Sequence, residues 1–179
     1  MSLWIRFLIM LLRACFGRRL RFPDEASVLH GRVLPNDLDL NVHMTNSRYL
    51  AVMDLGRVDF GVRTRLLGKL LARRGQPVVG GMRISFRRPL APLQRYRLET
   101  AVIGWTEHVM IFRHRFLVGS PGTEEVAAEA EVRTLYLHAG RKLPVQEVLE
   151  MIGYQRPSPS LDEALAYWAE RPRPARADM

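Results

Sequence analysis

Four segments in the second half of the chain alternate apolar and polar residues, and no helical segment separates them. They cover residues 82–88, 95–105, 108–118 and 126–138. In the first of them, Met82, Ile84 and Phe86 occupy one set of alternate positions and polar residues occupy the other. This period of two is typical of strands with one buried face. Strands that follow one another without helical crossovers predict an antiparallel sheet.

A long helical segment precedes these strands. Over residues 46–63, apolar side chains recur at spacings of three and four with few polar breaks, which predicts a mostly buried helix. A strand at 27–34 comes before it, and a shorter helix over 64–74 ends at Gly75. The order indicates an α+β fold in which an antiparallel sheet of about five strands wraps around a long central helix.

We expect three parts along the 179 residues. They are an apolar and basic N-terminal helix with a connector at 1–25, a core domain at 26–142, and a C-terminal extension at 143–179 with helices at 144–152 and 160–170 and a frayed tail at 171–176. The apolar stretch 1–16 is interrupted by Arg6 and Arg13 and is shorter than the roughly 20 residues that span a membrane. Two interpretations stay open, a helix lying in a membrane interface and a helix packed on the domain or on its partner subunit. A cleaved signal peptide is disfavoured.

The formal net charge is +9, and all basic residues except Lys69 and Lys142 are arginine. Either genome composition explains this, or the protein attracts a polyanion: nucleic acid, an anionic membrane surface or the phosphates of coenzyme A. The sequence lacks an aromatic and basic RNA-binding pattern, so nucleic acid is disfavoured. Cys15 is the only cysteine, which excludes an intrachain disulfide and a cysteine-rich zinc site. No histidine pair has metal-ligand spacing, so we predict no metal.

The polar segment between the first strand and the helix carries five candidate side chains: Asp37, Asp39, His43, Asn46 and Tyr49. If 37–39 is extended, the two carboxylates share a face, and like charges in proximity favour acid-base chemistry. The first amide N–H groups of the helix have no intrahelical partner and could bind a carbonyl oxygen as negative charge develops on it. Acyl hydrolysis needs these two parts.

Each candidate also has a structural alternative. Asp37 can cap the turn that follows Pro35, and Asn46 can serve as the helix N-cap. His43 can orient the loop through hydrogen bonds. Ser47 lacks the context of a nucleophile elbow.

The stretch 37–49, Asp-Leu-Asp-Leu-Asn-Val-His-Met-Thr-Asn-Ser-Arg-Tyr, resembles the D-x-D-x-x-G-H-x-N-N-x-x-Y signature of the 4-hydroxybenzoyl-CoA thioesterase-like hotdog proteins. The longer run 31–50 more closely resembles the thioesterase superfamily member six group. The expected element order agrees with a hotdog fold over about 26–139. The resemblance implies hydrolysis of thioesters of coenzyme A or acyl carrier protein, with no cofactor apart from the coenzyme A moiety of the substrate.

The resemblance also implies roles for individual residues. Asp39 corresponds to the aspartate that acts as nucleophile or as general base for water. The backbone N–H near Asn46 corresponds to the donor that polarises the thioester carbonyl, and Tyr49 and His43 correspond to residues that shape the site. Asp54 is a second-choice carboxylate, since some hotdog thioesterases take theirs from the helix.

Two residues of this chain, at positions 42 and 45, differ from the signature. Val42 replaces the usual glycine and Thr45 the first asparagine, and a valine tolerates a positive φ poorly. For Asp54, an i,i+3 pair with Arg57 is the stronger interpretation. The alternative function is a non-catalytic acyl-binding or membrane-associated protein.

We also expect Arg87 and Arg88 to bind phosphates of coenzyme A. A homodimer or homotetramer is expected because a lone five-stranded sheet leaves an open edge. The predicted location is cytoplasmic, with residues 1–16 as the contact if the protein is peripheral to the inner face of the membrane.

Overall fold

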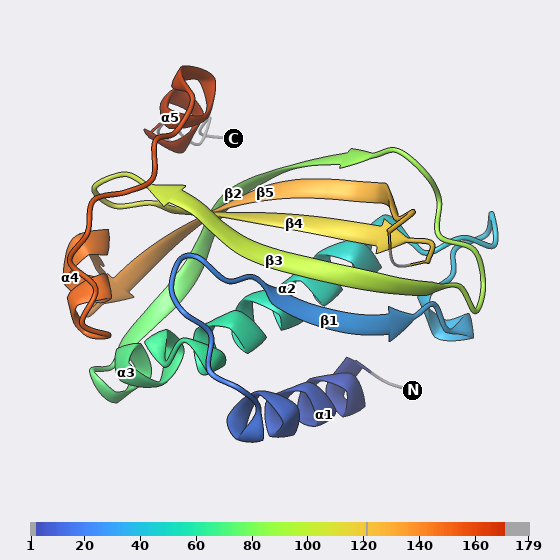
Figure 1. The fold of residues 1–179 in the computed structure, drawn as a ribbon, viewed down its shortest axis with the longest axis horizontal. Helices are drawn as coiled ribbons and strands as arrows, with labels where there is room; N and C mark the ends of the chain where they lie inside the picture. The colour runs from blue at the N-terminus through green and yellow to red at the C-terminus, as the bar shows by residue number, and fades with distance from the viewer. Residues whose placement is uncertain (1–2, 121, 171–179) are drawn as a thin grey trace, which may run out of the picture.

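The computed structural model describes residues 3–120 and 122–170 and places a sheet around one long helix (Figure 1). The elements in chain order are α1 (Leu3–Phe16), β1 (Ser27–Arg32), the 3-10 turn η1 (Pro35–Asp37), α2 (Asn46–Arg63), α3 (Leu66–Ala72), β2 (Gly75–Phe86), β3 (Arg95–Trp105), β4 (Met110–Val118), β5 (Glu125–His138), β6 (Arg141–Leu143), α4 (Val145–Glu150) and α5 (Glu163–Glu170).

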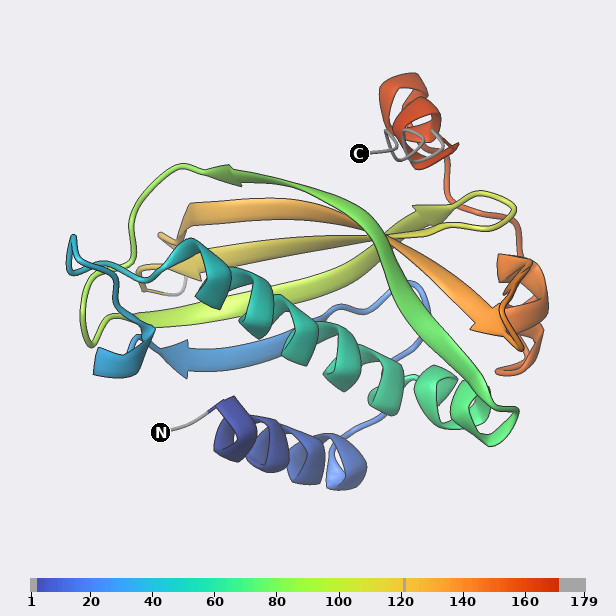
Figure 2. The same ribbon diagram turned by 180° about the vertical axis from the view of Figure 1, so that it is seen from behind.

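The strands form one antiparallel sheet in the order β1-β3-β4-β5-β2, and the short β6 pairs with β5. The sheet curls so that its concave face covers α2 (Figures 1 and 2). The α+β architecture predicted from the change of period is therefore confirmed, including the bounds of the central helix.

Close packing between α2 and the sheet depends on a small residue at the contact. Gly56 lies in the middle of α2, and a Cβ added there would be 2.3 Å from the Thr100 hydroxyl on β3. On either side of it, Met53 and Phe60 are fully buried. A side chain at position 56 would push the helix away from the strands, so glycine sets the depth of the helix in the sheet.

The sheet differs from the prediction at β2 and β6. β2 begins at Gly75, seven residues before the predicted start at Met82, and β6 was not predicted. The first part of β2 contains Pro77, Gly80 and Gly81, which are residue types that disfavour the interior of a strand. β2 is an edge strand, where a proline costs no ladder hydrogen bond, and a register shift between Val79 and Gly81 accommodates the glycines.

Helix α1 packs against α2 and β1 along one face only. Met10 and Ala14 are buried there beside Leu55 of α2. The opposite face is apolar and exposed: Trp4, Ile5, Leu8, Ile9, Leu12 and Phe16 are each at least 41% accessible. Within the described ranges, no helix combines the length and apolar character needed to cross a membrane.

The C-terminal extension contains the two predicted helices in shorter form, α4 and α5. The side chains of Val145, Val148 and Leu149 on α4 join the main apolar core. The predicted tail at 171–176 lies outside the described residues.

Candidate functional site

A tight loop directly before α2 holds Asp39 at the protein surface. Leu38 and Met44 form an isolated antiparallel bridge that closes the loop, and the Asp39 N–H donates to the His43 carbonyl at 2.9 Å. The Asp39 Oδ1 atom accepts hydrogen bonds from the backbone N–H groups of Asn41 at 2.8 Å and His43 at 3.2 Å. The carboxylate thus fixes the loop that presents it while the residue stays exposed to solvent.

Val42 adopts the left-handed conformation, with φ of 59°. The family signature has glycine at this position, so the loop takes a glycine-like backbone although the residue is valine. A β-branched residue is strained in this region. Valine in place of glycine therefore raises the conformational free energy of the loop, and the chain still forms the tight turn.

We expect Val42→Gly to raise the free energy of unfolding by about 1 kcal/mol. The strain released is on the order of 1–3 kcal/mol, and the extra entropy of glycine in the unfolded chain offsets roughly 0.5–1 kcal/mol of it. Urea unfolding measures the change. Val28→Gly in the extended strand β1 is the control and should destabilise; a loss of stability in both variants would contradict a strained Val42.

Asp37 lies in a buried ionic cluster, in contrast to the exposed Asp39. Its Oδ2 accepts the Leu34 N–H at 2.9 Å and a hydrogen bond from Arg6 of α1, and its Oδ1 forms an ion pair with the Arg48 Nε at 2.9 Å. The condition under which the two carboxylates would share a face, an extended segment at 37–39, is not met, because η1 turns the chain at Asp37 and leaves it buried while Asp39 is exposed. The prediction that Asp37 caps a turn is confirmed by its bond to Leu34.

The start of α2 lies immediately after this loop. Asn46 is its first residue and Thr45 is the N-cap, so the alternative of Asn46 as N-cap is wrong. The Thr45 N–H donates to the Asp37 carbonyl at 2.9 Å, which ties the helix start to the ionic cluster. The amide N–H groups of the first helical turn carry the positive end of the helix dipole and are suited to an oxyanion.

Tyr49 and His43 occupy different surroundings. The Tyr49 side chain is 2% accessible and packs edge-on against Phe86 and Phe116. Burial raises the pKa of Tyr49, and a backbone hydrogen bond with Leu90 acts against this. Tyr49 therefore supports the loop from the core, while His43 is half-buried and contributes its backbone to the Asp39 turn.

Arg87 and Arg88 lie at the end of β2 with exposed side chains. The Arg87 Nη2 is 3.1 Å from Glu129 Oε2, and the Arg88 Nη1 is 2.7 Å from Glu125 Oε2, both on β5. A phosphate that bound here would compete with these two carboxylates for the guanidinium groups.

The structure also reveals a buried polar chain that the sequence analysis missed. His114 on β4 is fully buried, with its Nδ1 3.0 Å from the Thr100 hydroxyl and its Nε2 3.1 Å from Arg57 Nη1. Arg57 also pairs with Asp54 one turn earlier on α2, which confirms the predicted i,i+3 pair. His114 is two residues from both Phe112 and Phe116 on β4 and therefore lies on the same apolar face. This spacing was the signal available in the sequence.

Burial, and secondarily the charge of Arg57, holds the pKa of His114 well below its ordinary value of 6.5. The folded protein therefore keeps a neutral ring that accepts from Arg57. The unfolded chain binds a proton at this histidine as the pH falls through about 6.5, and the folded state does not. The contribution of His114 to the free energy of unfolding is therefore fully present above that pH and decreases below it.

We expect this group to contribute a slope of about 1.4 kcal/mol per pH unit below pH 6.5. Urea unfolding between pH 7.5 and 5.0 measures the slope. The variant His114→Gln should show a shallower dependence, and identical slopes in the two proteins would rule out this assignment.

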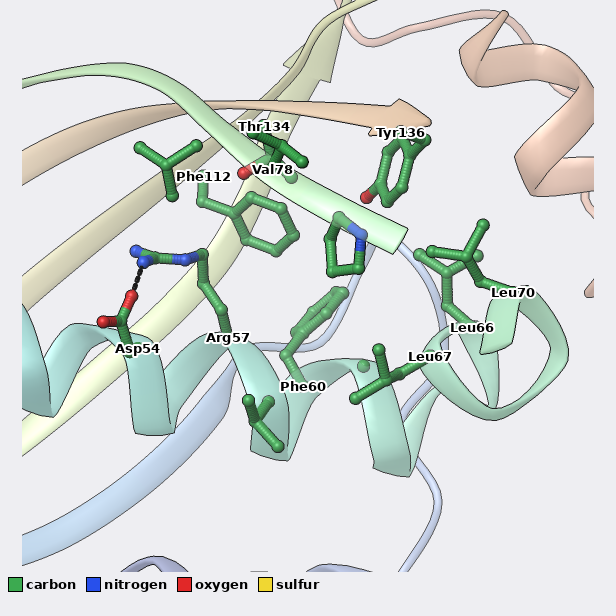
Figure 3. A pocket seen from close by; sticks show the side chains of 14 residues that line it. Asp54, Arg57, Phe60, Leu66, Leu67, Leu70, Val78, Phe112, Thr134 and Tyr136 are labelled. Atoms are coloured by element: carbon green, nitrogen blue, oxygen red, sulfur yellow. Dashed lines mark hydrogen bonds and ion pairs between the residues drawn. The ribbon is translucent and has the colours of Figure 1, made fainter. Parts of the chain in front are cut away.

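A pocket of about 230 Å³ lies between the C-terminal half of α2, α3, the first part of β2, and β4 and β5 (Figure 3). Its walls are mostly buried apolar side chains, among them Phe60, Leu66 and Phe112. Arg57 and Thr134 are polar members of the lining. Neither Asp39 nor Asn46 lines it. In the described part of the chain, no group of three or more His, Cys, Asp or Glu side chains is placed to hold a metal ion.

A curled antiparallel sheet around one helix, with a tight acidic loop before that helix, defines a hotdog fold of the 4-hydroxybenzoyl-CoA thioesterase kind. Residues 33–168 match the model of the thioesterase-like superfamily, and the chain belongs to this family.

Curated relatives agree with this assignment. The chain is 36% identical over 119 residues to Protein THEM6 of Danio rerio, which covers 66% of this chain and 59% of that protein. It is 25% identical over 154 residues to Protein THEM6 of Drosophila melanogaster, with 86% and 77% covered. The chain thus spans somewhat more than half the length of the zebrafish protein.

Solved structures share the fold at low sequence identity. The probable thioesterase YbaW of Escherichia coli has a TM-score of 0.64 at 20% identity and covers 72% of this chain and 99% of its own. The 4-hydroxybenzoyl-CoA thioesterase of Pseudomonas sp. strain CBS-3 has a TM-score of 0.61 at 13% identity, with 70% and 98% covered. At these identities the likeness establishes the fold.

Proposed function

We propose that the protein hydrolyses acyl thioesters of coenzyme A or acyl carrier protein. The observation that carries the proposal is the exposed Asp39 carboxylate, held by two backbone hydrogen bonds in the loop that leads into α2. Membership of the thioesterase-like superfamily supports thioester hydrolysis in general. The substrate and the mechanism are the proposal.

In this mechanism, Asp39 either activates a water molecule or attacks the thioester carbonyl itself. The negative charge that develops on the carbonyl oxygen is stabilised by backbone N–H groups at the start of α2, near Asn46. His43 and Tyr49 shape the site, His43 through the loop backbone and Tyr49 from the core. If Asp39 activates water, the thiolate of coenzyme A or the carrier protein leaves as the free acid forms. If Asp39 attacks the carbonyl itself, the thiolate leaves as a mixed anhydride with Asp39 forms, and water then hydrolyses this anhydride to release the acid and restore the carboxylate.

The charge of the protein suits an anionic substrate. The net charge of +9 favours attraction of coenzyme A phosphates or of an acidic carrier protein. Arg87 and Arg88 are exposed and are our candidates for phosphate contacts. We further propose a homodimer or homotetramer, because the edge strand β2 is twelve residues long and exposed edges favour pairing with a second copy.

Purified protein is assayed with acyl-CoA substrates of graded chain length and with acyl carrier protein thioesters. Release of free thiol on at least one of them is expected. No turnover on any substrate, with the folded state verified by circular dichroism, would reject hydrolysis and leave a non-catalytic acyl-binding protein.

A second candidate function is attachment to an anionic membrane surface through α1. Its six exposed apolar side chains form one outward face, and Arg18, Arg19 and Arg21 follow the helix directly. An apolar face with adjacent basic residues is the combination that binds a membrane interface.

Sedimentation with vesicles of phosphatidylcholine and phosphatidylglycerol tests this candidate. The wild type should sediment with anionic vesicles and less so at high salt, and Leu8→Glu with Leu12→Glu should remain in solution. The matched control, Leu40→Glu with Leu71→Glu, alters exposed leucines away from α1 and should sediment like the wild type. Equal sedimentation of both double variants would exclude α1 as the contact.

A further inference from the structure

We propose that the pocket between α2, α3 and β2 binds a medium-chain carboxylic acid that carries a hydroxyl or oxo group. This ligand site is separate from the Asp39 loop. It is defined by an apolar lining, a buried guanidinium at one end and an unpartnered buried hydroxyl in the wall (Figure 3).

The hydroxyl belongs to Thr134 on β5. The residue is 4% accessible, and its Oγ1 atom has no hydrogen-bond partner among the described residues. A buried hydroxyl without a partner loses its hydration and gains nothing in return. Thr134 faces Val79 across the ladder, next to the register shift at Val79 and Gly81, which is where β2 departs from regular pairing with β5. A ligand oxygen in the pocket would satisfy this hydroxyl.

The guanidinium belongs to Arg57 on α2, whose side chain is 11% accessible. Burial lowers the pKa of Arg57, and the nearby Asp54 carboxylate acts in the opposite direction. The Asp54 side chain is 65% accessible, so its charge is largely screened by solvent, and the other contact of Arg57 is the neutral His114 ring. A desolvated cation of this kind is stabilised by an anion that enters from the pocket side.

The lining determines the remainder of the ligand. Phe60, Leu66, Leu70 and Phe112 are at least 96% buried and offer only apolar contacts, and the Tyr136 hydroxyl already contacts the Met110 sulfur at 3.1 Å. At about 230 Å³ the pocket is smaller than the roughly 300–1,000 Å³ typical of sites for drug-sized ligands. A compact aliphatic acid with one further oxygen fits the small apolar lining, the guanidinium of Arg57 and the hydroxyl of Thr134.

Binding to the full chain is measured by titration calorimetry with octanoate, with octanoates hydroxylated at successive positions, and with the neutral octanamide. We expect at least one hydroxyoctanoate to bind about tenfold more tightly than octanoate, and octanamide to bind at least tenfold more weakly. Because no thioester is present, the result is independent of the hydrolysis assay.

Three variants assign the contacts. Thr134→Val should bring the preferred hydroxyoctanoate to the affinity of octanoate and should raise the Tm by roughly 2–4 °C, since it removes an unsatisfied hydroxyl. Arg57→Gln should weaken every acid at least tenfold. Asp54→Asn should tighten acid binding, because it removes the competing carboxylate from the exposed end of the pocket.

Arg141→Gln makes the same change of charge on the exposed strand β6 and should leave binding unaltered. A wild type that binds none of the acids at millimolar concentration would overturn the proposal. So would acid binding that Thr134→Val and Asp54→Asn both leave unchanged, and those two variants keep the test decisive if Arg57→Gln fails to fold.

Discussion

Replacing Asp39 with asparagine is expected to lower the rate of thioester hydrolysis by about 10²- to 10⁴-fold, the usual contribution of a general acid or base. The carboxylate accepts the N–H groups of Asn41 and His43 through Oδ1. An asparagine oxygen can accept the same two bonds, so the loop should keep its shape while the side chain loses its charge and basicity. The kcat on the best acyl-CoA substrate is the measurement.

Two further aspartates give this prediction its controls. Asp24→Asn alters an exposed aspartate in the connector and should leave the rate unchanged. Asp54→Asn tests the rival carboxylate on α2. If Asp54→Asn abolishes turnover and Asp39→Asn retains it, the helix rather than the loop supplies the catalytic carboxylate.

The largest loss of stability is expected from Asp37→Ala. The Asp37 side chain is fully buried, and removing it leaves Arg6, Arg48 and the Leu34 N–H without their shared acceptor. Breaking a buried pair from one side costs roughly 3–5 kcal/mol. We expect the lower part of this range, because the Arg48 side chain is 21% accessible and water can replace part of its lost interaction. Urea unfolding gives the free energy.

The matched control is Glu125→Ala, which also removes a carboxylate paired with an arginine. The Glu125 side chain is 68% accessible and that of its partner Arg88 is 54% accessible, and pairs of exposed groups contribute at most about 1 kcal/mol. Comparable losses in the two variants would show that burial of Asp37 does not determine its contribution. Arg6→Leu combined with Asp37→Ala should be less destabilising than the sum of the single changes, since the two side chains share one interaction.

The Arg6–Asp37 pair also has a consequence for the proposed site. It connects α1 to η1, two residues before Asp39. A helix with an exposed apolar face therefore contacts the same ionic cluster that positions the start of α2. Asp37→Ala is thus expected to disturb the Asp39 loop as well as the stability of the fold.

The sequence alone determined the order of elements and the central helix, because both depend on local periodicity. The apolar spacing over 46–63 matched α2 residue for residue, and alternation located most of β3, β4 and β5. The motif from 37 to 49 was likewise readable, since its residues are neighbours in the chain. Which of its side chains are buried and which are exposed could not be predicted, because periodicity carries no information about the burial of a loop.

Tertiary structure decided what segments distant in the sequence do to one another. Asp37 is a buried ionic centre because Arg6, 31 residues earlier, reaches it from α1. His114 is a neutral ring because the fold buries it completely, and the charge of Arg57, 57 positions away, adds to this effect. The first half of β2 is a strand because it lies at the edge of the sheet, where a proline and two glycines are tolerated. The sequence motif made Asp39 the candidate carboxylate; its exposure and the glycine-like backbone of Val42 in its loop came from the fold.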